Sequence, residues 1–237
     1  MIERNFNLKP FNTFGIDCFA AKFGTFKNVE ELKRLLSAKD KDEETFILGG
    51  GSNILFTKDF EGLVIKMEMK GIQLLKETPR EVLISVGAGE NWHLLVKYCV
   101  QKAWGGIENL SLIPGTVGAA PIQNIGAYGV EAKETIQQIT AYDTHTKQWV
   151  ILDNDACQFS YRNSLFKKEK NRYIIAEVQF LLQKQPRACQ GARLVSVVRR
   201  LWVDLVLGNL YFAFHLADRL RCSANSGALA CDARRTG

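Results

Sequence analysis

The sequence is poor in the residues that build metal sites and disulfide frameworks. It contains only three histidines, and its six cysteines include no C-x-x-C pair. Zinc sites need several such ligands at close spacing, and disulfide frameworks belong to short secreted chains. We therefore expect no metal and no disulfides, and we expect reduced, mostly buried thiols at Cys18, Cys99, Cys157, Cys189, Cys222 and Cys231.

Long apolar runs are also missing. The opening residues, MIERNFNLKP, lack the apolar run of a signal peptide, and no stretch approaches the roughly 18 apolar residues that suggest a membrane span. With 237 residues, of which 46% are hydrophobic, the chain is long enough to bury a core. We predict a globular, cytoplasmic protein with no membrane partner.

Most of the chain lacks a large net positive charge, although the formal net charge of the whole is +6. Residues 1–186 hold 18 Lys and 5 Arg against 22 acidic residues, a net charge of +1. Residues 187–237 hold 8 Arg and no Lys against 3 acidic residues, a net charge of +5. This tail has neither a nucleic-acid-binding motif nor regularly spaced stacking aromatics, so we expect no nucleic-acid partner.

The composition changes abruptly near Pro186. Beyond it, the apolar stretch of residues 194–216 follows neither a helical nor a strand period. A basic membrane-surface or interaction segment is one interpretation. A change of codon usage or reading frame explains better both the exchange of Lys for Arg and the missing period. Our hypothesis is that residues 187–237 are not the native continuation and are poorly ordered.

What is present in residues 1–186 is an α+β pattern of short segments punctuated by glycine. Apolar spacing predicts helices over residues 29–37 and 91–103, the second capped near Asn91. Compact apolar runs predict strands at Thr45–Leu48, Phe60–Lys66, Val82–Val86, Ile136–Tyr142, Trp149–Leu152 and Tyr173–Leu182.

Two glycine-rich loops are candidates for binding chemistry. The first, Gly49-Gly50-Gly51-Ser52-Asn53, follows a predicted strand and has a composition that lets backbone N–H groups converge on a phosphate. It matches neither the Walker nor the Rossmann pattern, and a tight strand-to-strand turn is an equally good interpretation. The second, residues 113–129, keeps its backbone bare over seventeen residues, which favours a ligand with apolar and phosphate parts. A third glycine-rich turn, residues 86–92, opens the second predicted helix, whose amino end would favour a nearby pyrophosphate.

These loops occur in an order that resembles the UDP-N-acetylenolpyruvoylglucosamine reductase family. The resemblance rests on five segments and covers nearly all of residues 1–186; the segments are Asn12–Asp17, Gly49–Asn53, Val86–Trp92, Pro114–Gly129 and Tyr161–Lys167. It implies an α+β, two-lobed FAD-binding fold of the vanillyl-alcohol-oxidase (PCMH) type. The lobes would be residues 1–70 and 71–186, with residues 187–237 in place of the substrate-binding domain.

The resemblance also implies an activity and its cofactors. Members of the family use FAD, with NADPH as co-substrate, to reduce UDP-N-acetylglucosamine enolpyruvate, a UDP-sugar, to UDP-N-acetylmuramate in peptidoglycan precursor synthesis. The residues implied to contact FAD are Gly49, Gly50, Gly51, Ser52, Asn53, Ile113, Pro114, Gly115, Gly118, Ala119, Ile122, Ile125, Gly126 and Ala127. Tyr161 and Arg162 correspond to the substrate-side pair, in which the arginine is catalytic and its forked cation stabilises an enolate.

The chain departs from the family beyond residue 186. The family's proton-donating serine lies in a G-S-F-F-K-N-P motif that is absent here, and no glutamate follows Glu177. Losing a general acid lowers a rate by about 10² to 10⁴. We therefore expect a member by descent with impaired activity. The alternatives are a non-catalytic FAD-binding fragment, a self-associating interaction module and, least favoured, a nucleic-acid-binding tail.

Overall fold

The computed structural model describes residues 2–184, which belong to one compact unit of the chain. The predictions for residues 187–237 lie outside the described residues. The strands are β1 (Ile2–Asn7), β2 (Phe19–Phe26), β3 (Thr45–Leu48), β4 (Phe60–Met67), β5 (Ile72–Glu77), β6 (Glu81–Gly87), β7 (Gly126–Ala127), β8 (Val130–Glu131), β9 (Ile136–Asp143), β10 (Gln148–Asp153) and β11 (Tyr173–Gln183). The α-helices are α1 (Val29–Ser37), α2 (Trp92–Gln101) and α3 (Leu165–Lys168), and the 3₁₀ helices are η1 (Lys9–Phe11), η2 (Glu108–Leu110), η3 (Val117–Ala119) and η4 (Ala132–Glu134).

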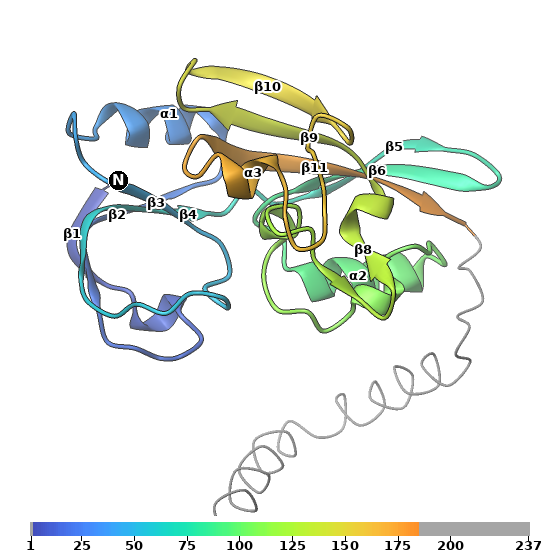
Figure 1. Ribbon diagram of the computed structural model, residues 1–237, viewed down its shortest axis with the longest axis horizontal. Coiled ribbons are helices and arrows are strands. Elements are labelled where there is room, and N and C mark those ends of the chain that lie inside the picture. Colours follow the sequence, from blue (N-terminus) through green and yellow to red (C-terminus); the bar gives the residue numbers. More distant parts are fainter. Residues whose placement is uncertain (1, 185–237) are drawn as a thin grey trace, which may run out of the picture. The chain divides into compact units, whose positions relative to one another are not determined.

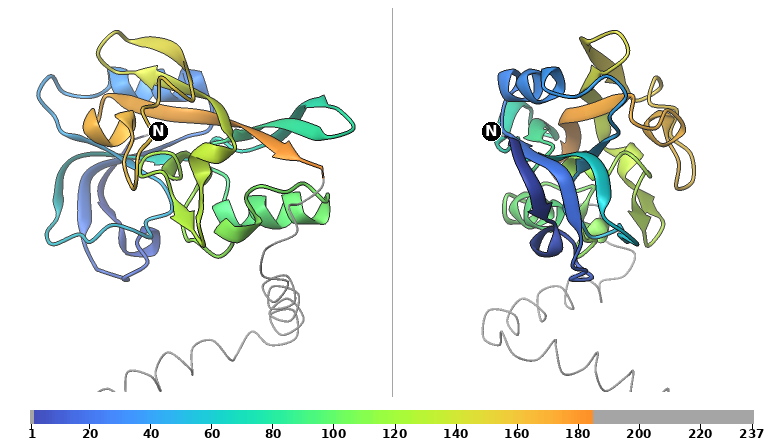
Figure 2. Two further views of the ribbon diagram at one scale, coloured as in Figure 1. Left: turned by 45° about the vertical axis from the view of Figure 1, so that its right-hand side comes forward. Right: turned by 90° about the vertical axis from the view of Figure 1, so that its left-hand side faces the viewer.

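The first sheet has the strand order β1-β2-β4-β3. β1 is antiparallel to β2, whereas β2, β4 and β3 are parallel. Helix α1 lies on one side of this sheet, and the loop with η1 lies on the other side (Figures 1 and 2). The helix approaches β2 at Gly24, where a Cβ would lie 2.5 Å from a methyl group of Leu35.

The second sheet has the order β10-β9-β11-β6-β5 and is antiparallel throughout. β11 therefore runs along the middle of the sheet, although it is the last strand in sequence. Helix α2 lies below this sheet in Figure 2, and its Trp92 ring lies 6.0 Å from the Phe180 ring of β11. The short strands β7 and β8 form a separate two-stranded pair.

Both sheets share one hydrophobic core, and the first sheet has a second, smaller core on its other face. Strand β4 shows why: Leu63 and Ile65 belong to the shared core, whereas Val64 packs in the smaller core. Since successive side chains of a strand point to opposite faces, β4 is buried on both sides. The smaller core consists of Leu8, Cys18, Ala20, Phe23, Leu48, Phe56 and Val64.

The predicted helices and strands are confirmed, with end shifts of at most two residues. The Asn91 cap is confirmed as well, because its side chain accepts the N–H of Leu94. Sequence patterns missed β1, β2, β5, the short pair β7 and β8, and α3. β1 and β5 are edge strands rich in polar and charged residues, so they lack the apolar run that marks a strand.

Candidate functional site

The first glycine loop, residues 49–53, begins where β3 ends. Because β3 and β4 run parallel, the chain must travel back along the sheet between them, and the tight-turn interpretation was wrong. Gly51 has a φ of +67°, and a Cβ there would lie 1.9 Å from the carbonyl oxygen of Phe11. Thr13 donates its N–H and its hydroxyl to the Gly51 carbonyl at 3.0 and 3.3 Å. The position therefore accepts only glycine.

The donors of this loop are available to a ligand. The backbone N–H groups of residues 50–53 have no hydrogen-bond acceptor among residues 2–184, and neither do the side chains of Ser52 and Asn53. Backbone N–H groups are strong donors that seek a partner. Successive N–H groups in a glycine-rich loop form an anion-binding element.

The second loop, residues 113–129, is tied to the turn that opens α2. The N–H of Trp92 donates to the Gly115 carbonyl at 3.1 Å. Gly118 packs so closely that a Cβ there would lie 2.6 Å from the Cβ of Ala88. The first donor of α2 is thus taken by the loop, while Trp92 itself lines the cavity described below. The favourable effect of the amino end of α2 on a nearby pyrophosphate stays a prediction.

His93 supports the start of the second loop. Its Nδ1 accepts the N–H of Leu112 at 3.3 Å and lies 3.1 Å from the hydroxyl of Ser111. Leu112 has a φ of +63°, in the left-handed region. Burial, with a smaller contribution from Lys97, lowers the pKa of His93, which keeps the imidazole neutral and Nδ1 able to accept.

The two loops contact each other and line one cavity of about 530 Å³. A Cβ on Gly50 would lie 3.1 Å from the Cα of Gly115, so side chains are excluded where the loops meet. Ten of the predicted cofactor residues line the cavity: Gly49, Gly50, Gly51, Ser52, Asn53, Pro114, Gly115, Ala119, Ile122 and Ile125. Four others, Ile113, Gly118, Gly126 and Ala127, flank it without lining it.

Sequence reasoning missed the rest of the cavity wall. It comes from strand β3, the residue after the first loop, the start of α2, further positions of the second loop, and the segment from α3 to β11; the residues are Phe46, Ile47, Leu48, Ile54, Trp92, Thr116, Ala120, Gln123, Phe166, Lys167, Lys170, Asn171 and Tyr173. Signals were available for six of them. Phe166 and Lys167 belong to the Tyr161–Lys167 segment, Trp92 ends the Val86–Trp92 segment, and Thr116, Ala120 and Gln123 lie in the second loop. The other residues have no local pattern that marks them.

The charge around the cavity is positive. The lining residues include Lys167 and Lys170 and no aspartate or glutamate. Behind the loop, the ammonium group of Lys66 donates to the Gly49 carbonyl. A cavity with aromatic walls, cations and free N–H donors suits a ligand that combines an aromatic ring system with phosphate groups.

A set of side-chain hydrogen bonds, which we call the Asn124 clasp, joins the second loop to residues 160–164. The fully buried Asn124 donates its Nδ2 to the Ser160 carbonyl at 3.1 Å. The buried hydroxyl of Ser164 donates to the Ile122 carbonyl at 2.6 Å. Two segments that were singled out separately in the sequence therefore form one structural unit.

Arg162 and Tyr161 lie on the outside of the Asn124 clasp. An Nη2 of Arg162 donates to the Gly126 carbonyl at 2.6 Å, and the guanidinium carbon lies 5.9 Å from the Tyr161 ring centre. The Tyr161 side chain is 83% exposed, and neither residue lines the cavity. A guanidinium has five N–H donors, so Arg162 keeps donors for a ligand outside the cavity.

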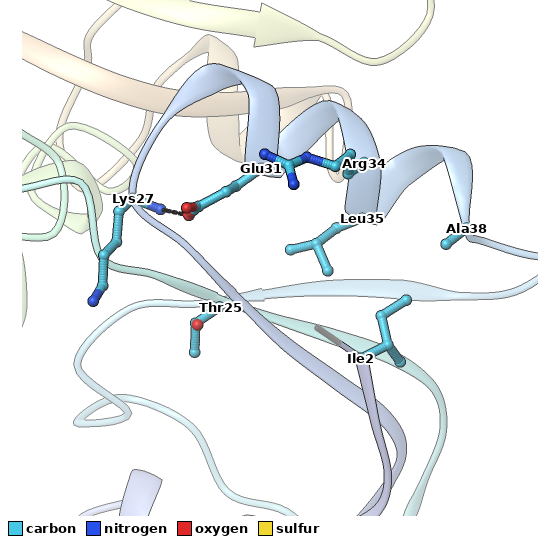
Figure 3. Close-up of a pocket in the computed structure, with 7 residues that line it drawn as sticks. All are labelled: Ile2, Thr25, Lys27, Glu31, Arg34, Leu35 and Ala38. Carbon is cyan, nitrogen blue, oxygen red and sulfur yellow. Dashed lines mark hydrogen bonds between the residues drawn. The ribbon is translucent and has the colours of Figure 1, made fainter.

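A second hollow, of about 540 Å³, lies between α1 and the edge of β1 and β2 (Figure 3). Its charged side chains do not converge. The Lys27 side chain runs away from α1 whereas the Arg34 guanidinium lies along it, and Glu31 accepts the Lys27 N–H at 2.7 Å. We assign no ligand to this hollow.

Cysteine chemistry and metal binding receive no support within residues 2–184. No three His, Cys, Asp or Glu side chains cluster there. Cys18, Cys99 and Cys157 are buried free thiols. Burial raises the pKa of Cys99 and of Cys157 to about 12. In the same part of the chain, no helix has the length and apolarity needed to cross a membrane.

The chain matches known proteins along most of its described length. A family model described as FAD binding domain matches residues 21–148. The UDP-N-acetylenolpyruvoylglucosamine reductase of Amoebophilus asiaticus is 49% identical over 187 residues, which are 78% of this chain and 55% of the relative. That of Neisseria gonorrhoeae is 49% identical over 179 residues, which are 75% of this chain and 52% of the relative. The chain thus spans about half the length of the curated relatives it matches.

Solved structures show the same fold. The crystal structure of the UDP-N-acetylenolpyruvylglucosamine reductase from Thermus caldophilus aligns with a TM-score of 0.67 at 25% identity, over 84% of this chain and 69% of that one. A solvent-stable cholesterol oxidase aligns with a TM-score of 0.51 at 14% identity, over 73% of this chain and 37% of that one. This second likeness concerns the fold alone. Together with the family match, these alignments confirm the predicted α+β FAD-binding fold.

Proposed function

Since the chain belongs to the FAD binding domain family, we propose that residues 49–53 and 113–127 together hold FAD in the cavity that they line. The observation that carries the proposal is the character of this cavity. Its wall offers aromatic side chains, two lysines and no carboxylate, and the N–H groups of residues 50–53 are available. These features suit the flavin ring and the doubly charged pyrophosphate, respectively. The division into lobes at residue 70 is part of this proposal.

We propose further that the chain descends from a reductase of UDP-N-acetylglucosamine enolpyruvate that uses NADPH in peptidoglycan precursor synthesis in the cytoplasm. The names of the relatives support this substrate. The flavin, when bound, supplies hydride transfer. Arg162 would bind the enolpyruvyl group through donors that Gly126 leaves unused, and Tyr161 would cover the sugar nucleotide from the exposed side.

This 237-residue chain carries only part of the catalytic equipment implied by the resemblance. It contains no G-S-F-F-K-N-P motif and no glutamate after Glu177. Without the proton donor, completion of the reduction slows by about 10² to 10⁴. The function we propose for the chain as given is therefore FAD binding with impaired or absent turnover of the UDP-sugar.

A non-catalytic, self-associating module is the second candidate. Its support is the exposure of Tyr128 (73%) and Tyr161 (83%) beside the Asn124 clasp, since large exposed aromatic side chains often mark contact surfaces. Size-exclusion chromatography separates the candidates. A colourless protein that elutes above monomer size favours the module, whereas a yellow protein favours FAD binding.

The decisive experiment follows the flavin spectrum. FAD-loaded protein is mixed anaerobically with NADPH, and UDP-N-acetylglucosamine enolpyruvate is then added. We expect flavin absorbance at purification and no rapid reoxidation by the UDP-sugar. Rapid reoxidation would contradict impaired turnover, and failure to retain or rebind FAD would contradict the cofactor assignment.

A further inference from the structure

Lys66 lies at the end of two parallel strands, next to the first glycine loop. It is the residue of β4 that pairs in register with Leu48, the last residue of β3. Since side chains alternate along a strand, Lys66 points to the same face as Val64, which packs in the smaller core. A lysine on this face is unexpected from composition alone, because burial of an ammonium group is unfavourable.

The ammonium group has one hydrogen-bond partner among residues 2–184, the carbonyl of Gly49. It forms no ion pair with a carboxylate in that part of the chain. Burial lowers its pKa, Glu68 opposes this shift from a distance, and Lys70 adds to it. The positive charge of Lys66 is therefore left without a neutralising contact and lies directly behind the loop.

The contact fixes the direction of one peptide group. The described peptide bonds are all trans, and a trans peptide points its C=O and its N–H to opposite sides. Because the Gly49 carbonyl faces Lys66, the N–H of Gly50 faces away from it. That N–H has no acceptor among residues 2–184, and both glycines line the cavity.

We propose that Lys66 is a positioning residue for the pyrophosphate of FAD. It holds the Gly49–Gly50 peptide with its N–H toward the cavity, and it adds a positive charge behind that N–H. The chain therefore discriminates in favour of a flavin that carries a pyrophosphate. This inference rests on the proposed FAD binding and names a residue that increases the affinity for FAD.

The test compares FAD with riboflavin, which lacks both the pyrophosphate and the adenosine of FAD. Protein freed of flavin is titrated with FAD and with riboflavin, and binding is followed by flavin fluorescence. The variants are K66M, which removes the charge and the donor, and K66R, which keeps both. The control is K76M, which removes an exposed lysine from the outer strand β5.

We expect K66M to weaken FAD binding about ten- to a hundredfold, which is typical of losing a hydrogen bond from a charged group. Riboflavin binding should change less than about threefold, since riboflavin has no phosphate. K66R should restore most of the FAD affinity, and K76M should leave both affinities unchanged. Equal weakening for both flavins would indicate a general structural role and overturn the proposal.

Two further outcomes separate this proposal from the proposed function. If the wild-type protein binds FAD and K66M binds it equally well, Lys66 has no role, although FAD binding stands. If the wild-type protein binds neither flavin, both proposals fail. Circular dichroism of the flavin-free variants tests folding, with K66Q as a second uncharged variant. Unfolding of both uncharged variants would make Lys66 a residue of the core and also overturn the proposal.

Discussion

The side chain of Asn124 donates a hydrogen bond to the Ser160 carbonyl at 3.1 Å, across 36 residues of sequence. Its Oδ1 accepts the N–H of Lys133 at 3.0 Å, so both ends of the buried amide are used. Each bond pairs a backbone group with the buried side chain of Asn124, which itself has no access to water. Asn124 also has a φ of +43°, which asparagine tolerates better than most residues.

Replacing Asn124 by aspartate should destabilise the protein. N124D keeps the shape and the tolerance of positive φ, but it turns the Nδ2 donor into a carboxylate oxygen facing the Ser160 carbonyl. We expect a loss of about 2 to 4 kcal/mol in the free energy of unfolding. Urea denaturation followed by tryptophan fluorescence measures it. N5D is the matched control, because Asn5 has a φ of +50° and is exposed. A loss below about 0.5 kcal/mol in N124D would show that the clasp is unimportant.

Replacing Gly51 by alanine should lower the free energy of unfolding far more than replacing Gly129 by alanine. Both glycines have positive φ, +67° and +78°, so both variants pay the backbone strain of about 1 kcal/mol. Only at Gly51 does the new Cβ collide, 1.9 Å from the Phe11 carbonyl, since Gly129 has no atom within 4 Å. We expect G51A to lose at least about 2 kcal/mol more than G129A and to lose FAD. Equal unfolding midpoints would mean that the Phe11 segment moves aside freely.

Removing the Arg162 side chain should leave FAD affinity nearly intact. Arg162 does not line the cavity, and its bond goes to the Gly126 carbonyl. We expect R162M to bind FAD within about threefold of wild type, since that single bond is largely solvent-exposed. Fluorescence titration measures this, with R80M as the control for losing an exposed arginine. A tenfold loss in R162M alone would place the guanidinium with the cofactor rather than with the UDP-sugar.

Acid should weaken the fold through Asp143. Hydrogen bonds from Arg172 at 3.0 and 3.2 Å hold the pKa of Asp143 at about 2, below its ordinary value of 3.8. The folded state therefore favours the carboxylate. This contribution to stability is complete above the unfolded pKa and is lost as the pH falls from about 4 toward 2. D143N should unfold at lower urea than wild type at pH 7 and lose less stability in acid. If the unfolding free energies of wild type and D143N fell equally with pH, Asp143 would not be the cause of the acid sensitivity.

The described thiols should resist alkylation in the native protein. Cys99 and Cys157 are fully buried, and a pKa of about 12 leaves almost no thiolate at neutral pH. Peptide mass spectrometry after iodoacetamide at pH 7.5 should find both unmodified, along with Cys18. The same treatment in urea should modify all three. Rapid native labelling of Cys99 would show that α2 opens readily.

Both glycine-rich loops of the cavity could be singled out from the sequence, because clusters of glycine mark them. Gly51 and Gly115 are required by positive φ and close backbone approach, so the loops were visible without a structure. The places of Lys66 and Tyr173 at the site could not be predicted from local sequence, because they depend on the order of the strands in the two sheets. Nothing local indicates that β4 lies beside β3, or that residue 173 lies near residue 50. Edge strands such as β1 were missed for the complementary reason, since their outward faces are polar.

The central place of β11 governs when this protein can fold during synthesis. β9 and β6 each pair with β11 and not with each other, so the five-stranded sheet has no middle until residues 173–183 exist. Until the ribosome has made that segment, the hairpins β5–β6 and β9–β10 leave the edges of β6 and β9 unpaired. The nascent chain is therefore most exposed to proteases and to mispairing just before its last described strand leaves the exit tunnel.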